Sequence, residues 1–263
     1  MSVSKLESLP NEILIDMFEK YLTGIDIIKA FAFRLNRRFD GIVAQCRRIR
    51  FDFMRCRKDD FRFCMGLLPY YIDKIEELAL SEQNTPGQIH AFFTRYPSFD
   101  FFKQLRKLYF HINMEALDPT LVRHVLFSIS EATLHTLSIK ITKTLEFYID
   151  SMIMEIFRMK SLKKLIIGWD EYDMLWSSLN EVSSNIEYLT IRDSSFKYEN
   201  LTHIFRCATH LKYLDVYIFF HRYWNGYQSK LSLKNSLPQM SMLHTAIFNI
   251  HQENDDIQRY LEP

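Results

Sequence analysis

Metal binding is the first chemistry that side-chain spacing suggests, because His203, Cys207 and His210 follow one another at helical spacing. Imidazole and thiolate are ligands that zinc prefers, and a helix would turn all three side chains toward one side. A structural zinc site needs a fourth ligand, and the neighbouring sequence offers none. We therefore expect no metal site, and we interpret this segment as a helix with ordinary polar residues.

Catalytic motifs are missing from the chain. It contains no G-x-S-x-G, H-E-x-x-H or G-x-G-x-x-G pattern and no phosphate-cradling loop, and it has only 6 glycines. The 4 cysteines form no C-x-x-C pair. We expect a protein that is not an enzyme and that carries no cofactor.

A basic segment runs from Arg47 to Arg62, with arginines and a lysine interleaved with phenylalanines. Such a pattern can contact nucleic acid. Asp52, Asp59 and Asp60 offset these charges, which favours an amphipathic unit with its charges turned outward. Nucleic acid is therefore not the partner that we expect.

Length and composition are typical of an intracellular globular protein. The 263 residues are 48% hydrophobic and 25% charged, and the formal net charge of +1 implies no global electrostatic partner. The first residues lack the charged start and apolar core of a signal peptide, and no apolar run approaches the roughly 18 residues that a membrane span needs. We expect a soluble protein of the cytoplasm, the nucleus or both, with no membrane partner.

Three short helices are predicted near the N-terminus. Leu9-Pro10 followed by Glu12 indicates a helix start, with Ser8 as its cap, and Gly24 indicates a helix end. A unit this small is near the lower limit for burying its own core, yet it carries more large apolar side chains than one interior seam requires. Part of this surface is expected to be covered by a partner. An N-terminal cap that seals the rest of the protein would explain the same excess.

Residues 6–39 resemble an F-box, the helical module that joins substrate receptors to Skp–cullin–F-box ubiquitin ligases. The resemblance rests on residues 6–14, on Asp26-Ile27-Ile28 and on Arg37-Arg38-Phe39, where many family members have a tryptophan one residue further on. It implies that the first two helices bind a Skp-type adaptor and, through it, a cullin. The positions that it implies for adaptor contact are Leu9, Pro10, Ile13, Leu14, Phe18, Leu22, Ile27 and Ile28. Alanine at Leu14 or Phe18 is then expected to weaken adaptor binding by about 2 kcal/mol or more while the repeats stay folded.

The pattern L-x-x-L-x-L recurs seven times downstream, at intervals of about 24 to 32 residues. The copies begin at Ile75, Leu105, Leu134, Leu162, Ile186, Leu211 and Leu243. Segments with helical periodicity separate them, so each unit predicts a strand followed by a helix. The pattern resembles leucine-rich repeats, which implies a curved solenoid with parallel strands inside and helices outside. The ninth position is polar in six of the seven copies, Gln83 in the first and Asn113 in the second, and these residues are expected to hydrogen-bond the turn. Phe219 is the one break.

The expected fold class is therefore α/β, in three parts. Residues 1–48 are the three-helix F-box, residues 49–71 a helical linker or first capping unit, and residues 72–263 a leucine-rich-repeat solenoid of about seven irregular repeats. An F-box followed by such repeats resembles a ubiquitin-ligase substrate receptor, which holds an unknown protein substrate and makes no bonds itself. The alternative is a leucine-rich-repeat interaction scaffold whose helical N-terminal cap recruits no ligase.

Substrate contacts are expected on the strand face opposite the leucines, because side chains alternate along a strand. Basic and aromatic residues on this face favour an acidic or phosphorylated segment, with tyrosines as anchors. A solvated and functionally neutral face is the alternative. The residues are Lys107, Tyr109, Lys140, Lys164, Tyr188, Arg192 and Tyr213.

An aromatic run coincides with the longest repeat, and extra residues in a repeat usually form a loop on one face, often the binding face. Tyr217, Phe220, Tyr223, Trp224 and Tyr227 are therefore expected to join the substrate surface. Capping of the C-terminal end of the solenoid is an equally good explanation of these aromatic residues.

Overall fold

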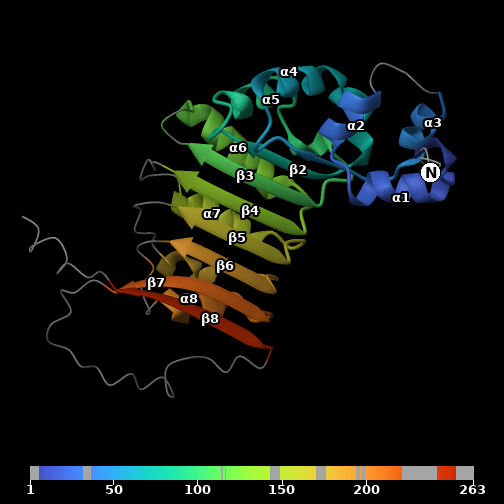
Figure 1. The fold of residues 1–263 in the computed structure, drawn as a ribbon. Helices are drawn as coiled ribbons and strands as arrows, with labels where there is room; N and C mark the ends of the chain where they lie inside the picture. Colours follow the sequence, from blue (N-terminus) through green and yellow to red (C-terminus); the bar gives the residue numbers. More distant parts are fainter. Residues whose placement is uncertain are drawn as a thin grey trace, which may run out of the picture. The chain divides into compact units, whose positions relative to one another are not determined.

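The computed structural model describes residues 6–31, 37–113, 115, 117–142, 149–169, 176–193, 196, 200–220 and 242–252. The chain divides into two compact units. Unit 1 comprises residues 1–112 and 116–134, and unit 2 comprises residues 113–115 and 135–263. Each unit is α/β, with parallel strands and helices (Figure 1). The division falls inside the expected repeat region, and the N-terminal helices share a unit with the first strands.

Unit 1 begins with helices and continues with alternating strands and helices. Its helices are α1 (Asn11–Lys20), α2 (Gly24–Phe31), α3 (Arg37–Gln45), α4 (Lys58–Leu67), α5 (Gln88–Arg95) and α6 (Pro119–Glu131). Its strands are β1 (Ile49–Asp52), β2 (Ile75–Ser81) and β3 (Lys107–Asn113), paired in parallel in that order. Short 3-10 turns are η1 (Leu6–Ser8), η2 (Leu68–Tyr70), η3 (Ile72–Lys74) and η4 (Phe99–Phe101).

The three N-terminal helices share an aromatic core. Phe18 of α1 is 1% exposed, and its ring stacks on Phe31 of α2 and Phe39 of α3, with ring centroids 5.2 and 6.2 Å away. Leu14, one turn before Phe18, is fully buried. The helices therefore depend on one another for their burial, as expected for a unit this small.

The helix boundaries differ from the sequence-based prediction. Gly24 is the first residue of α2 and does not end α1. Thr23 explains this start, because its hydroxyl accepts a hydrogen bond from the Asp26 N–H at 3.2 Å while the Asp26 carboxylate accepts one from the Thr23 N–H at 3.0 Å. This reciprocal pair is a capping box. Helix α1 begins after Pro10 without a side-chain cap, so Ser8 does not cap it.

The segment expected as a helical linker, residues 49–71, begins with strand β1. Ile49, Phe51 and Phe53 are buried, whereas Asp52 between them is exposed. This alternation is the period of a strand with one buried face. Together with α4, the strand makes a further strand–helix unit ahead of the seven copies that the sequence pattern identifies.

Side chains near the start of α5 hydrogen-bond the turns that follow β1 and β2. Gln88 is 1% exposed and bonds the Ser81 N–H at 2.8 Å and the Phe53 carbonyl at 3.1 Å. The Glu82 carboxylate accepts hydrogen bonds from two N–H groups at the start of α5, at 2.6 and 2.7 Å. Gln83, predicted to bond the turn through its side chain, is exposed instead.

In the part of unit 2 that the structure describes, five parallel strands pair in sequence order. The strands are β4 (Thr136–Thr142), β5 (Lys164–Trp169), β6 (Tyr188–Asp193), β7 (Tyr213–Phe220) and β8 (Thr245–Gln252). The helices are α7 (Ile149–Arg158) and α8 (Asn200–Cys207), with the 3-10 helix η6 (Trp176–Glu181) between them. Figure 1 shows α7 and α8 on one face of this sheet.

The leucine positions of the repeat pattern on β4 to β7 form the core of unit 2, whereas Phe248 of the last copy is 44% exposed. Leu137, Leu165, Leu189 and Leu214 stand in register across four strands, and each is fully buried. Helix residues at helical spacing, such as Ile153 of α7, are buried as well. The seven predicted strands are therefore present as β2 to β8. None of the helices in the described ranges is both long enough and apolar enough to cross a bilayer.

Candidate functional site

Helix α1 has one broad apolar face that is buried along one edge and exposed along the other. Leu14 and Phe18 are buried at one edge, whereas Ile13 is 53% exposed at the other, with Met17 half-buried one turn later. Tyr21, another turn along, is 75% exposed. Residues four apart lie on the same side of a helix, so these three form the exposed edge of one broad apolar face whose other edge, at Leu14 and Phe18, is buried. We call Ile13, Met17 and Tyr21 the exposed stripe.

The positions predicted to contact an adaptor are divided between core and surface. The buried ones are Leu14, Phe18, Ile27 and Ile28. Leu9 and Leu22 are half-buried, and Pro10 and Ile13 are exposed. The four buried side chains stabilise the fold of unit 1. Only the positions that are exposed could contact a partner directly.

Two exposed apolar residues beside this surface were not among the predicted positions. They are Leu6, which is 42% exposed, and Tyr21. The sequence does carry a signal for Tyr21, because Ile13, Met17 and Tyr21 repeat every fourth residue, one position out of phase with Leu14 and Phe18.

Arg38 of α3 fixes the start of α1. Its Nε and Nη2 atoms both bond the Asn11 side-chain oxygen, at 2.9 and 2.8 Å, and Nη2 also donates to the Leu9 carbonyl. These contacts join the start of α1 to α3, but the guanidinium is only a donor and does not cap the free N–H groups of the first turn. The exposed stripe is therefore presented on a helix that is held in place at its first turn.

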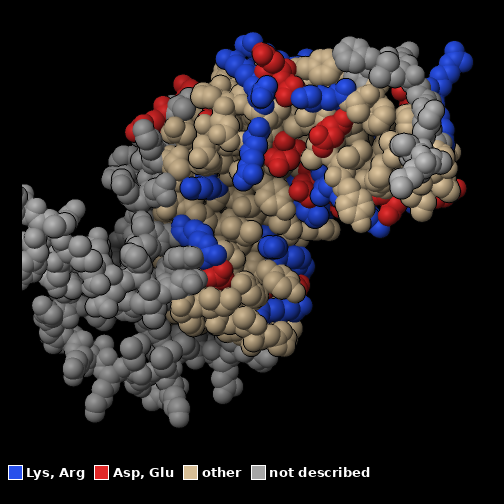
Figure 2. Space-filling model, in the orientation of Figure 1, with Lys and Arg blue, Asp and Glu red and all other residues tan. Residues whose placement is uncertain are grey.

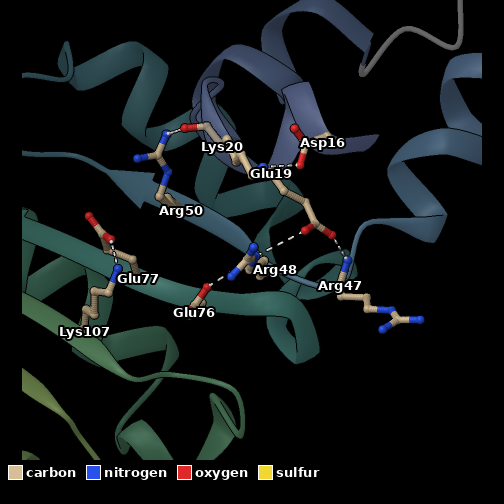
Figure 3. A network of polar contacts seen from close by, with 9 residues as sticks. All are labelled: Asp16, Glu19, Lys20, Arg47, Arg48, Arg50, Glu76, Glu77 and Lys107. Carbon is tan, nitrogen blue, oxygen red and sulfur yellow. Dashed lines mark hydrogen bonds and ion pairs between the residues drawn. The ribbon is translucent and has the colours of Figure 1, made fainter. Parts of the chain in front are cut away.

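A second polar network holds α1 against the strands of unit 1 (Figure 3). Glu19 of α1, whose side chain is only 13% exposed, accepts hydrogen bonds from the Arg47 N–H at 2.6 Å and from the Arg48 Nε at 3.2 Å. Arg50 of β1 donates to the Lys20 carbonyl at 2.6 Å. These arginines of the basic segment therefore have structural roles beside α1.

The sheet of unit 2 presents a second candidate surface, opposite the buried leucines. Lys164, Tyr188 and Tyr213 stand side by side in register on β5, β6 and β7. Tyr188 is 44% exposed, and its ring centroid lies 6.4 Å from that of Tyr213. We call these three residues the lysine–tyrosine row. It forms where the strands begin.

An ion pair lies further along the same face, from Asp215 near the start of β7 to Arg192 near the end of β6. Arg192 of β6 donates two hydrogen bonds to the Asp215 carboxylate, at 3.0 and 2.8 Å. Asp215 is 8% exposed, and Gly168 in register on β5 leaves room for Arg192, because a Cβ there would lie 3.3 Å from the Arg192 Cβ. Asp215 therefore offsets much of the charge that Arg192 was predicted to offer a substrate.

Lys140 and Lys164, unlike Arg192, have no ion-pair partner in the described ranges. Both side chains are exposed. Figure 2 shows basic side chains at both ends of the unit 2 strands, with uncharged surface between them. The structure thus brings Lys140, Lys164, Tyr188, Arg192 and Tyr213 onto one face of unit 2, as predicted.

A row of charges that sequence reasoning missed lies next to the lysine–tyrosine row. Glu187 bonds Lys212 at 2.6 Å and Lys163 at 3.2 Å. The hydrogen bond from Lys212, and after it that from Lys163, lowers the pKa of Glu187 below its ordinary value. The signal was available, because the second position of three consecutive repeat copies reads Lys163, Glu187 and Lys212.

Lys107 and Tyr109 belong to unit 1. Lys107 is paired with Glu77 on the neighbouring strand at 3.3 Å. Tyr109 is half-buried, and this burial, followed by the charge of Glu77, raises the pKa of its hydroxyl. The structure therefore gives both residues a local partner on the strand face of unit 1.

The aromatic run is largely outside the described part of the chain. Tyr217 and Phe220 lie on β7, but their side chains are not among those that the structure describes. Tyr223, Trp224 and Tyr227 lie outside the described residues altogether. Their predicted role in substrate contact stays a prediction.

His203, Cys207 and His210 lie at the C-terminal end of α8 and just after it. His203 bonds the Asn180 side-chain oxygen at 2.8 Å, and Cys207 is buried. Across the ranges that the structure describes, His, Cys, Asp and Glu side chains form no group of three that could hold a metal ion.

All four cysteines are buried, and burial raises the pKa of each thiol. The pKa rises to about 11 for Cys46 and Cys56 and to about 12 for Cys64 and Cys207, from an ordinary value near 9. Thiolate, not thiol, is the nucleophile, so these side chains are unreactive at neutral pH.

Alkaline pH is therefore expected to destabilise the protein. The unfolded chain loses thiol protons as the pH passes about 9, whereas the folded chain keeps them until about 11 to 12, so the free energy of unfolding falls between these values. Urea unfolding at about pH 8 and about pH 10 measures the loss. A thiol reagent such as DTNB should modify the protein only after denaturation, and rapid reaction of the folded protein at pH 8 would contradict the burial of all four cysteines.

Comparison with models of known protein families and with curated protein sequences finds no match for this chain.

Proposed function

We propose that this protein is the substrate-recognition subunit of a Skp–cullin–F-box ubiquitin ligase. In this proposal α1 to α3 form the F-box that binds a Skp-type adaptor, and the strand–helix units form a leucine-rich-repeat solenoid that binds the protein to be ubiquitinated. The chain itself catalyses nothing. It raises the local concentration of a substrate lysine near the ubiquitin-charged enzyme that the cullin carries, in the cytoplasm or the nucleus.

The exposed stripe of α1 is the observation that carries this proposal. The apolar face of α1 is only partly covered by unit 1, and Ile13 and Tyr21 at its edge remain 53% and 75% exposed. Contiguous apolar surface of this kind is typical of a site where another protein binds. Because Arg38 and Glu19 fix α1 in place, the stripe is ordered before a partner arrives. A preordered surface loses less entropy on binding.

Ile13→Asp is expected to abolish the adaptor complex, weakening binding at least tenfold. A carboxylate at this position would be left without water or a partner when an apolar surface covers it. Stability should change by less than about 0.5 kcal/mol, because the side chain is exposed in the free protein. Co-expression with a Skp-type adaptor, followed by size-exclusion chromatography and titration calorimetry, gives both the complex and its affinity.

Phe127→Asp is the matched control, because Phe127 on α6 is 60% exposed in the same unit but lies far from α1 in sequence. It should bind the adaptor as the wild type does. Equal loss in both variants would indicate a general effect of added charge. A wild type that forms no complex would leave the alternative, a repeat scaffold on which α1 to α3 act as a cap. The packing of Phe51 against Gly24 is compatible with that alternative.

A further inference from the structure

The lysine–tyrosine row has the composition of a small binding site for a peptide. Tyr188 and Tyr213 offer two neighbouring rings with polar tips, and tyrosine is among the residues that contribute most at protein interfaces. Lys164, next to Tyr188 in register, offers an exposed ammonium. A partner that fits would place an anionic group on the lysine and an apolar group on the rings.

The charges beside this row favour an anionic partner. Lys163 and Lys212 share one carboxylate, that of Glu187, and Lys164 adds a further positive charge. Three lysines against one glutamate leave a net charge of about +2 where β5, β6 and β7 begin. By contrast, Arg192, further along the same face, is held by Asp215. Anion binding is therefore favoured at the lysine–tyrosine row over Arg192.

We propose that Lys164, Tyr188 and Tyr213 bind a peptide segment in which an acidic or phosphorylated side chain stands beside an aromatic or other apolar one. The inference rests on the proposed function in so far as this segment belongs to the protein presented for ubiquitination. Lys164 pairs with the anionic group, and the tyrosine rings pack on the apolar one. Lys163 and Lys212 add longer-range attraction, which salt screens.

Binding is tested with a fluorescein-labelled random copolymer of glutamate and tyrosine, titrated with the full chain and followed by anisotropy. We expect tighter binding of this probe than of poly-glutamate, weakening as the salt concentration rises, and no binding of a lysine–tyrosine copolymer. Phosphorylating the tyrosines of the probe distinguishes the two anions. Tighter binding after phosphorylation identifies a phosphoryl group as the preferred ligand, and unchanged binding identifies a carboxylate.

Variants locate the site. Lys164→Gln and Tyr188→Ala are each expected to weaken binding about five- to tenfold, because each removes one of the two contacts. The controls are Lys103→Gln and Tyr70→Ala, exposed residues of unit 1 that should leave binding unchanged. Equal binding of poly-glutamate and the copolymer, equal effects of the control variants, or no binding of the copolymer would each overturn the inference.

The adaptor experiment separates this inference from the proposed function. Lys164→Gln should still form the adaptor complex, and Ile13→Asp should still bind the copolymer. A protein that binds the adaptor but not the copolymer would overturn only the peptide site. A protein that binds the copolymer through Tyr188 but forms no adaptor complex would keep the peptide site and overturn the proposed function.

Discussion

Replacing Phe18 with alanine is expected to lower the free energy of unfolding by about 3–5 kcal/mol, the usual range when a large buried aromatic side chain is truncated. Phe18 is 1% exposed and stacks on Phe31 and Phe39, so its ring joins three helices. The two rings that remain, Phe31 and Phe39, are on different helices, so neither can fill the space without moving its helix. Urea unfolding followed by far-ultraviolet circular dichroism measures the change.

Ile13→Ala is the matched control, on the same helix but at the exposed edge of its apolar face. Its unfolding free energy should change by less than about 0.5 kcal/mol. The expectation that Phe18→Ala weakens adaptor binding while the repeats stay folded remains a prediction. Because Phe18 is buried, the substitution is expected to destabilise unit 1 as well. Similar losses in the two variants would contradict the division of this face of α1 into a buried and an exposed edge.

The strands were predictable because their signal is local. Each copy of L-x-x-L-x-L places apolar side chains on one face within six residues, and Leu78, Leu165 and Leu214 are fully buried as this pattern requires. Their parallel order followed from the alternation with helical segments, which leaves room for a crossover on one side. Local periodicity and unit length were therefore enough for the coarse α/β fold.

Strand β1 escaped prediction because it carries none of the leucines of the pattern. Ile49, Phe51 and Phe53 do alternate with polar residues, but four residues of strand are a weak signal when arginines surround them. The strand is defined by its pairing with β2, a contact between residues about 26 apart in sequence. A short stretch of sequence does not show which distant residues a strand will pair with.

The side chains that hydrogen-bond the turns could also not all be identified from a short stretch of sequence. The ninth-position rule holds at Asn113, whose side-chain oxygen accepts a hydrogen bond from the Glu115 N–H at 3.2 Å. Near Gln83, by contrast, it is Gln88 and Glu82 that make the hydrogen bonds. Which polar side chain reaches the turn depends on where α5 begins, and the left-handed Gly87 sets that point with a φ of 79°. Many polar residues near a turn could satisfy it, so composition alone does not choose among them.

The sequence identified which charged residues lie on the candidate site. It did not show which of these charges form ion pairs with one another. Arg192 and Lys107 were predicted to help attract an acidic segment, and the structure pairs them with Asp215 and Glu77 on neighbouring strands. These pairs depend on strand register, which a list of residues does not contain. The register therefore changes the expected site from a broad basic stripe to the shorter lysine–tyrosine row.

Gly24→Ala is expected to destabilise the protein by about 3 kcal/mol, at the upper end of what overpacking a core costs. A Cβ at this position would lie 2.5 Å from both Cε atoms of the Phe51 ring and would also meet its Cζ. Phe51 is 1% exposed and has the Phe53 ring 5.6 Å away, so it has little space into which to move. The variant should therefore loosen α2 from β1, and thermal unfolding would show a lower Tm.

Gly41→Ala is the same substitution, but it is expected to raise the stability of the protein and not to lower it. Gly41 lies inside α3, and a Cβ there would meet nothing within 4 Å. Alanine in an open helix position restricts the unfolded chain and should raise stability by about 0.5–1 kcal/mol. A higher Tm for Gly41→Ala beside a lower Tm for Gly24→Ala would place the N-terminal helices directly on β1. Equal effects would mean that α2 does not pack on Phe51, and α1 to α3 could then be removed as a separate module.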